Sequence, residues 1–176
     1  MLELAILGFL KEAPLHGYEL RKRIAALTGH IKPIAESTLY PAIKRLETAG
    51  WLRRDTQPGA GAAPRHVLSL TAEGHRELLR RLADPAALDI SDENRWFTQL
   101  AFLRHLADPA AQAAVLRRRL EFLEQPSSFF YEGDRPLRAE ELDDPFRQGM
   151  LTIARATSKA ELGWLRETLA ALDAAS

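Results

Sequence analysis

The chain has 176 residues, of which 46% are hydrophobic and 27% are charged, a composition typical of a folded globular protein and not of a disordered one. It contains no cysteine, which excludes a disulfide framework, a thiolate nucleophile and a thiolate metal site. The first ten residues carry Glu3 in place of a basic leader region, and no apolar run approaches the about 20 residues that cross a bilayer. We therefore expect a soluble, cytoplasmic protein with no membrane partner.

The charge is unevenly distributed although the net charge is zero. Residues 1–83 hold 13 Lys+Arg against 8 Asp+Glu, and residues 84–176 hold 11 against 16. The imbalance is steepest between Arg21 and Arg54, where eight basic residues accompany two acidic ones. Such a split favours a basic module for a polyanion joined to a segment with another task, although charges scattered over a solvated surface give the same count.

Two short helices are expected first. Residues 2–11 are apolar nearly all round, as in a helix that is buried on most sides. His16-Gly17-Tyr18-Glu19 leads into a second helix that ends near Gly29. Its apolar positions have helical spacing: Leu20, Ile24 and Leu27. We expect His16 and Tyr18 to hold the start of this helix against the core.

A third helix is expected between Ser37, as the N-cap, and Gly50, as the C-terminal stop. Pro41 is placed in its first turn, where a missing N–H has no helical partner to lose. Its apolar positions are Leu39, Ile43 and Leu46. Its opposite face carries Thr38, Tyr40, Lys44, Arg45 and Thr48. A helix that enters the major groove needs hydrogen-bonding and cationic side chains on such an outer face.

A hairpin and a fourth helix complete the first half. The runs 51–56 and 65–70 flank the Gly- and Pro-containing segment 58–64, which predicts a two-stranded hairpin. Thr71 is expected to cap a helix over 72–83. Three helices, a hairpin and a helix in this order form the winged helix-turn-helix plan.

The second half is expected to be helical. Residues 92–106 and 109–124 have the pattern of amphipathic helices, and we expect residues 127–138 to form a loop. An apolar stripe from 140 to 171 predicts one helix of about 45 Å. A stripe of this length exceeds what so short a chain buries by itself, so a second copy of the chain is the expected partner.

Catalytic and metal-binding patterns are absent from the sequence. The five histidines include no His-x-x-x-His pair, and no carboxylates cluster around them. Gly59-Ala60-Gly61 lacks the Lys-Ser/Thr ending of a phosphate loop. We therefore expect no enzyme, no metal site and no cofactor.

Four motifs stand out in residues 2–83: His16-Gly17-Tyr18-Glu19-Leu20, the run from Ser37 to Glu47 around Tyr40-Pro41, Gly50-Trp51-Leu52 and Leu70-Thr71-Ala72-Glu73-Gly74. Together they resemble the PadR family of bacterial transcriptional regulators. The resemblance implies a mainly α protein with a winged helix-turn-helix DNA-binding domain and two-stranded wing at 1–83, and an α-helical dimerisation domain at 84–176. It also implies a homodimeric repressor on double-stranded operator DNA, and we expect a small effector to release it.

The DNA-binding residues expected on this basis lie on the third helix and at the base of the wing. They are Ser37, Thr38, Tyr40, Lys44, Arg45, Arg53, Arg54 and Arg65. The wing tip at 59–63 is neutral, whereas family wings often carry basic residues there. A half-buried tyrosine and ordinary solvated charges give the same pattern on the third helix, so a winged-helix module that binds protein and not DNA stays an alternative.

Three aromatic residues of the acidic half have two interpretations. Trp96, Phe97 and Trp164 either form part of a dimer core or border a pocket for a small aromatic effector.

Overall fold

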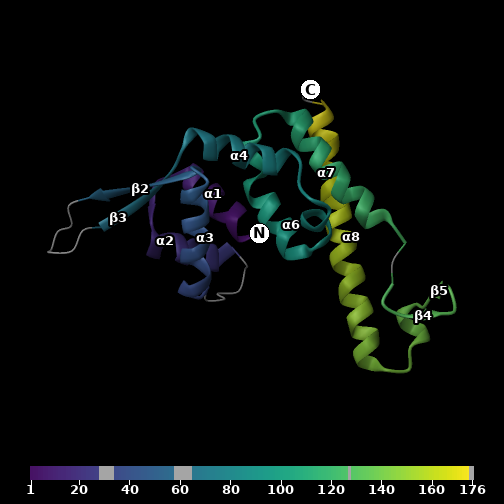
Figure 1. The fold of residues 1–176 in the computed structure, drawn as a ribbon. Helices are drawn as coiled ribbons and strands as arrows, with labels where there is room; N and C mark the ends of the chain where they lie inside the picture. The colour runs from purple at the N-terminus through teal and green to yellow at the C-terminus, as the bar shows by residue number, and fades with distance from the viewer. Residues whose placement is uncertain (28–33, 58–64, 127, 175–176) are drawn as a thin grey trace. The chain divides into compact units, whose positions relative to one another are not determined.

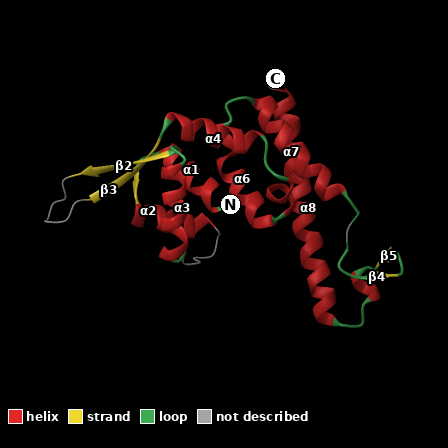
Figure 2. Cartoon of the chain, viewed as in Figure 1, coloured by secondary structure: helices red, strands yellow, loops and turns green. Residues whose placement is uncertain are grey.

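The computed structural model describes residues 1–27, 34–57, 65–126 and 128–174. It is mainly helical, with one small sheet and a separate short hairpin, which confirms the mainly α fold class (Figures 1 and 2). The elements of the first half are α1 (Leu2–Glu12), β1 (Leu15–His16), α2 (Gly17–Leu27), α3 (Glu36–Thr48), β2 (Leu52–Gln57), β3 (Arg65–Leu70) and α4 (Ala72–Ala83). Those of the second half are α5 (Ala87–Ser91), α6 (Glu93–Phe102), η1 (Leu103–His105), α7 (Pro109–Glu124), β4 (Tyr131–Glu132), β5 (Arg135–Pro136), η2 (Ala139–Glu141) and α8 (Pro145–Ala174).

The chain divides into two compact units, Met1–Ala107 and Asp108–Ser176. The first unit contains the winged-helix elements and also α5, α6 and η1. The functional boundary expected at residue 83 stays a prediction, since a compact unit is not the same as a functional domain.

The core of the first unit is built where α1, α2 and α3 pack together. Side chains that are completely buried come from all three helices: Ile6, Leu7, Leu20, Leu39 and Ile43. Burying one such side chain contributes about 1.5 to 3 kcal/mol, so this cluster holds the three helices in place. The buried residues of α2 include Leu20 and Ile24, as expected, whereas Gly29 lies outside the described residues.

The third helix begins earlier than the sequence suggests. Its N-cap is Ala35, whose carbonyl oxygen accepts from the backbone N–H groups of Thr38 and Leu39, so Ser37 as N-cap was wrong. Pro41 is consequently the sixth residue of the helix and does not lie in its first turn. Proline there removes the hydrogen bond that would end on the Ser37 carbonyl, a loss that an exposed turn of helix tolerates because water reaches the carbonyl.

The end of α3 lies where the sequence predicts it. Gly50 has a φ of 74°, a conformation that favours glycine, and its N–H donates to the carbonyl of Glu47. The N–H of Trp51 reaches back to the carbonyl of Leu46. These two bonds form a Schellman motif, which ends the helix and directs the chain into β2.

The sheet has three strands in the order β1-β3-β2. The hairpin strands β2 and β3 are antiparallel and pair Leu52 with Leu70 and Arg54 with Leu68, as a two-stranded wing requires. The two-residue strand β1 was missed, because Leu15 and His16 are too few to show a strand period. It fixes the base of the wing to the start of α2.

Helix α4 begins at the expected cap and packs very closely on the start of the wing. The Thr71 hydroxyl accepts from the N–H of Gly74 and donates to the carbonyl of Gly50. A Cβ atom at Gly74 would lie 2.0 Å from the backbone oxygen of Trp51. Only glycine therefore fits where α4 crosses this segment.

We expect Gly74→Ala to lower the free energy of unfolding by about 1 to 3 kcal/mol, because the backbone of Trp51 must move to admit the methyl group. Urea denaturation measures the change. Gly149→Ala on α8 is the matched control, since nothing lies within 4 Å of the added Cβ, and it is expected to leave stability unchanged or raise it. A Gly74→Ala variant as stable as the parent chain would contradict the close approach.

The helix expected over 92–106 is present as α6, which the 3-10 helix η1 continues to His105, whereas α5 was not expected. Asp92 caps α6 by accepting from the N–H of Arg95, and a separate helix α5 precedes it. Helix α6 packs on α1, where Gly8 leaves room for the ring of Phe102; a Cβ there would lie 2.5 Å from the ring. This contact explains why α6 belongs to the first compact unit.

The second unit is formed by the packing of α7 on α8. Arg119 of α7 is 3% exposed and donates to both carboxylate oxygens of Glu161 on α8, at 2.7 and 2.9 Å. The long helix begins at Pro145, five residues later than expected, because Asp144 caps it by accepting from the N–H of Phe146. The loop expected over 127–138 contains the hairpin β4–β5, turned at Gly133 with a φ of 59°, and Ser127 lies outside the described residues.

Candidate nucleic-acid interface

The burial of α3 is one-sided, as its sequence pattern predicts. Leu39, Ala42 and Ile43 are completely buried and Leu46 almost so. The side chains of the opposite face are exposed: Ser37, Thr38, Tyr40, Lys44, Arg45 and Thr48. Hydroxyl groups and cations therefore share one outward face of α3.

A cavity of about 400 Å³ opens beside this face, between α2, α3 and the base of the wing. Tyr40 lies against the start of α2, where its ring and hydroxyl would be 3.5 Å from a Cβ atom at Gly17. Tyr18 also lines the cavity, and its side chain is 70% exposed, so the expectation that it packs into the core is wrong. The cavity has two phenol groups near its mouth and is open to solvent.

The wall of the cavity is fixed by the sheet. The Nδ1–H of His16 donates to the backbone carbonyl of His66 at 3.0 Å, which joins β1 to β3 and confirms a structural role for His16. Thr56 and His66 are linked by a side-chain hydrogen bond of 3.3 Å across β2 and β3. These bonds hold the wing base at a fixed position beside α3.

Many of the arginines that make this half basic are paired with its own carboxylates. The pairs are Arg21–Glu36, Arg23–Glu19, Arg45–Glu3, Arg53–Asp55 and Arg54–Glu47. Lys44, in contrast, has no carboxylate within 4 Å in the described part of the chain and is exposed. The surface is thus less positive than the count of basic residues suggests, and Lys44 is its available cation on α3.

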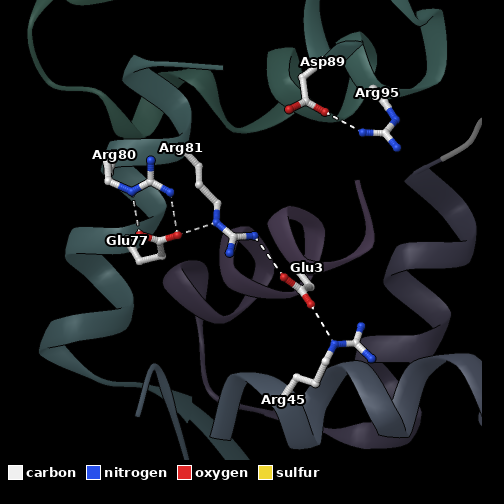
Figure 3. Close-up of polar contacts among 7 residues, drawn as sticks. All are labelled: Glu3, Arg45, Glu77, Arg80, Arg81, Asp89 and Arg95. Atoms are coloured by element: carbon white, nitrogen blue, oxygen red, sulfur yellow. Dashed lines mark hydrogen bonds and ion pairs between the residues drawn. The ribbon is translucent and has the colours of Figure 1, made fainter. Parts of the chain in front are cut away.

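Arg45 belongs to a chain of ion pairs that connects three helices (Figure 3). Glu3 of α1 accepts from Arg45 of α3 and from Arg81 of α4, and Arg81 also donates to Glu77. Arg80 donates to both oxygens of Glu77 as well. The hydrogen bond from Arg80, with the further bond from Arg81, outweighs burial and lowers the pKa of Glu77 from 4.5 to about 2.

Because the pKa of Glu77 is depressed in the folded chain, its stabilising contribution is complete above about pH 4.5 and is lost as the pH falls toward 2. We expect Glu77→Gln to be less stable than the parent chain at neutral pH and the difference to narrow in acid. Urea unfolding at a series of pH values measures both. A stability difference that stays constant down to about pH 2.5 would contradict the role of this carboxylate.

Part of the expected wing contact falls outside the described structure. Residues 58–64, which include the neutral tip at 59–63, are not described, and neither is the side chain of Arg65. Arg53 and Arg54 are exposed at the base of the wing on adjacent positions of β2, so their side chains leave opposite faces of the hairpin.

The three aromatic residues named for an effector pocket do not share one environment. Trp96 is completely buried in α6, whereas Phe97 beside it is 46% exposed. Trp164 is half-exposed on α8 and belongs to the other compact unit. Burial of Trp96 fits a core role, and ligand binding by any of the three stays a prediction.

A second surface of interest runs along α8. A stripe of mostly apolar residues repeats there alternately four and three residues apart, interrupted by one threonine: Phe146, Met150, Ile153, Thr157, Ala160 and Trp164. Phe146 and Ile153 are strongly exposed, at 87% and 70%. The buried residues of this helix, Leu151, Leu165 and Leu169, lie on a different face. Spacing that alternates between four and three residues is that of a seam between two helices.

The described residues also bear on metal-dependent and membrane functions. No group of three or more His, Cys, Asp or Glu side chains there is arranged to hold a metal ion. Within those same residues, every helix is too short or too polar to cross a bilayer.

Comparison with known proteins gives a family for the first half. Residues 6–80 match the Transcriptional regulator PadR-like family. The probable transcriptional regulator Rv1176c of Mycobacterium tuberculosis is 30% identical over 81 residues, which are 46% of this chain and 43% of that protein. This chain therefore spans less than half of the length of that curated relative.

Solved structures are also similar. A transcriptional regulator from Clostridium thermocellum is 30% identical, with a TM-score of 0.42 over 45% of this chain and 76% of that one. Bacillus subtilis PadR in complex with operator DNA is 24% identical, with a TM-score of 0.44 over 97% of this chain and 98% of that one.

Proposed function

Because residues 6–80 of this chain belong to the Transcriptional regulator PadR-like family, we propose that the protein binds double-stranded operator DNA as a homodimeric repressor. The outer face of α3 enters the major groove, and Arg53, Arg54 and Arg65 at the wing base contact the phosphate backbone. This family consists of transcriptional regulators and not of enzymes.

The observation that carries this proposal is the outward face of α3. Tyr40 and Lys44 are exposed one position after the buried Leu39 and Ile43, so both side chains point away from the core. Lys44 is held by no carboxylate of the described chain, so a phosphate or a guanine edge meets it without displacing an internal partner. Thr38 and Ser37 add hydroxyl groups that donate to bases or phosphates.

The paired arginines affect how the complex responds to salt. Each phosphate that a cation neutralises adds about −0.9 to the slope of log affinity against log salt concentration. Arg53 and Arg54 are partly neutralised by Asp55 and Glu47 before DNA arrives, so their net contribution is small. The proposed complex therefore depends on orientation and base contacts more than on total charge.

The operator is found by selection from random-sequence duplexes with the full-length protein. Lys44→Ala is then expected to weaken binding by about 1 to 3 kcal/mol and to relax the preference at one position if Lys44 meets a base, or to reduce the salt slope by about 1 if it meets phosphate. Tyr40→Phe separates the hydroxyl group from the ring. Fluorescence anisotropy at several salt concentrations measures these effects.

Lys159→Ala is the matched control for Lys44→Ala, because Lys159 is an exposed lysine of α8. It is expected to leave affinity unchanged, and thermal melts verify that each variant is folded. If the wild-type chain enriches no duplex, or the folded Tyr40→Ala, Lys44→Ala double variant binds at full affinity, the DNA-binding proposal fails. A winged-helix module that binds protein and not DNA then becomes the better hypothesis for the function.

The homodimer is proposed to form along the exposed stripe of α8. We expect Ile153→Glu to convert the dimer to a monomer, because a carboxylate in the seam loses water without gaining a partner. Thr152→Glu is the control, since it places the same charge on an exposed position off the stripe. Light scattering gives the mass of each. A dimer that survives Ile153→Glu would place the interface elsewhere.

Release by a small aromatic effector is part of the same proposal. Phe97 of the first unit and Trp164 of the second are each exposed, and each by itself offers a ring face for such a ligand, while the buried Trp96 supports the core around it.

A further inference from the structure

We propose that Glu3 is a positioning residue for DNA recognition, which fixes the guanidinium group of Arg45 on the recognition helix so that its free edge is presented to DNA. The inference rests on the proposed function, because it concerns the same outward face of α3.

The geometry gives each oxygen of the Glu3 carboxylate its own partner. Oε1 accepts from Nε of Arg45 on α3 at 3.1 Å, and Oε2 accepts from Nη1 of Arg81 on α4 at 3.2 Å. Glu3 stands in the first turn of α1 and its side chain is 29% exposed. One carboxylate thus joins three helices of the winged-helix unit (Figure 3).

The Arg81 side of this bridge is firmly held. Arg81 donates through Nε to Glu77 at 2.7 Å, and its guanidinium lies over the ring of Trp51 at 5.0 Å from the centroid. Its side chain is only one-quarter exposed. Arg45, in contrast, is 63% exposed and stands in the last turn of α3. Glu3 is therefore anchored from the side of α4 and acts on the more exposed Arg45.

The chemistry of arginine makes this contact directional. The guanidinium group is planar and carries five N–H donors, of which Glu3 engages the one on Nε. Fixing Nε fixes the plane that contains both Nη groups. The Nη edge is then oriented before DNA arrives, and a planar edge pairs with a phosphate or with guanine through two hydrogen bonds. Less side-chain freedom is lost on binding when the edge is already oriented.

If Glu3 had a purely electrostatic role, removing its charge would change DNA affinity in the opposite direction. A carboxylate near DNA repels phosphate, so removing its charge strengthens binding to every duplex alike. If Glu3 has a positioning role, removing its charge weakens binding to the selected operator more than binding to unrelated DNA. The ratio of the two affinities therefore separates these roles, and stability alone does not.

The experiment uses Glu3→Gln, which keeps the shape of the side chain and removes its charge. Anisotropy measures affinity for the selected duplex and for a scrambled duplex of the same length and composition. We expect the ratio of the affinities to fall by at least about threefold. In an Arg45→Ala background the same substitution is expected to leave the ratio unchanged, because the group that Glu3 orients is gone.

The controls follow from the neighbouring pairs. Glu73→Gln removes the carboxylate of an exposed pair with Arg76 within α4 and is expected to leave the ratio unchanged. Arg81→Lys, which keeps the charge but not the fork of donors, is expected to lower the ratio in the same direction as Glu3→Gln. This variant also tests the proposal if Glu3→Gln does not fold, as judged by thermal melts.

Three results would overturn the inference. They are an unchanged ratio of affinities in folded Glu3→Gln, an equal rise in affinity for both duplexes, or a fall in the ratio on Glu3→Gln that persists in the Arg45→Ala background. Each of them leaves the proposed function standing, because the wild-type chain still selects a duplex and Lys44→Ala still weakens it. A wild-type chain that selects no duplex refutes the proposed function itself.

Discussion

The burial of one face of α3 is the constraint on which the functional surface depends. Leu39, Ile43 and Leu46 have almost no exposed surface, so the helix cannot rotate about its axis without exposing apolar area at about 25 cal/mol per Å². This packing sets which side chains face outward. The Schellman motif at Gly50 then fixes where β2 departs, and the wing base lies beside the same face of the helix. The wing and the residues that we propose for DNA recognition are thus positioned by the core and not by their own contacts.

Many basic side chains in the first half of the chain form ion pairs with carboxylates of the same chain, which reduces the positive charge that is available to a ligand. Residues 1–83 have an excess of basic residues, yet the arginines around α3 and β2 meet carboxylates within 4 Å. Exposed pairs of this kind add little to stability. We expect them instead to orient guanidinium groups and to reduce non-specific attraction for polyanions. Lys44, which lacks such a partner in the described residues, differs in kind from its neighbour Arg45.

Local signals were sufficient to predict most of the elements and the outward face of α3. Thr71 and Gly50 act as cap and stop at the expected positions, because capping depends on a few adjacent residues. The start of α3 was misplaced because Ala35 caps through its carbonyl alone, with no side-chain signal. Strand β1 and the Glu3–Arg45 pair were missed because both join segments that are distant in sequence. Such long-range contacts leave no local pattern in a single sequence. The contribution of Arg65 and of Trp164 to any site stays a prediction.

Hydrogen exchange of the full-length protein, with and without the selected duplex, tests the central claim most directly. We expect DNA to slow the exchange of backbone amides in the α2–α3 region and at the wing base, while those in the β4–β5 hairpin exchange as before. Protection confined to α7, α8 or the β4–β5 hairpin, with α3 unaffected, would contradict it.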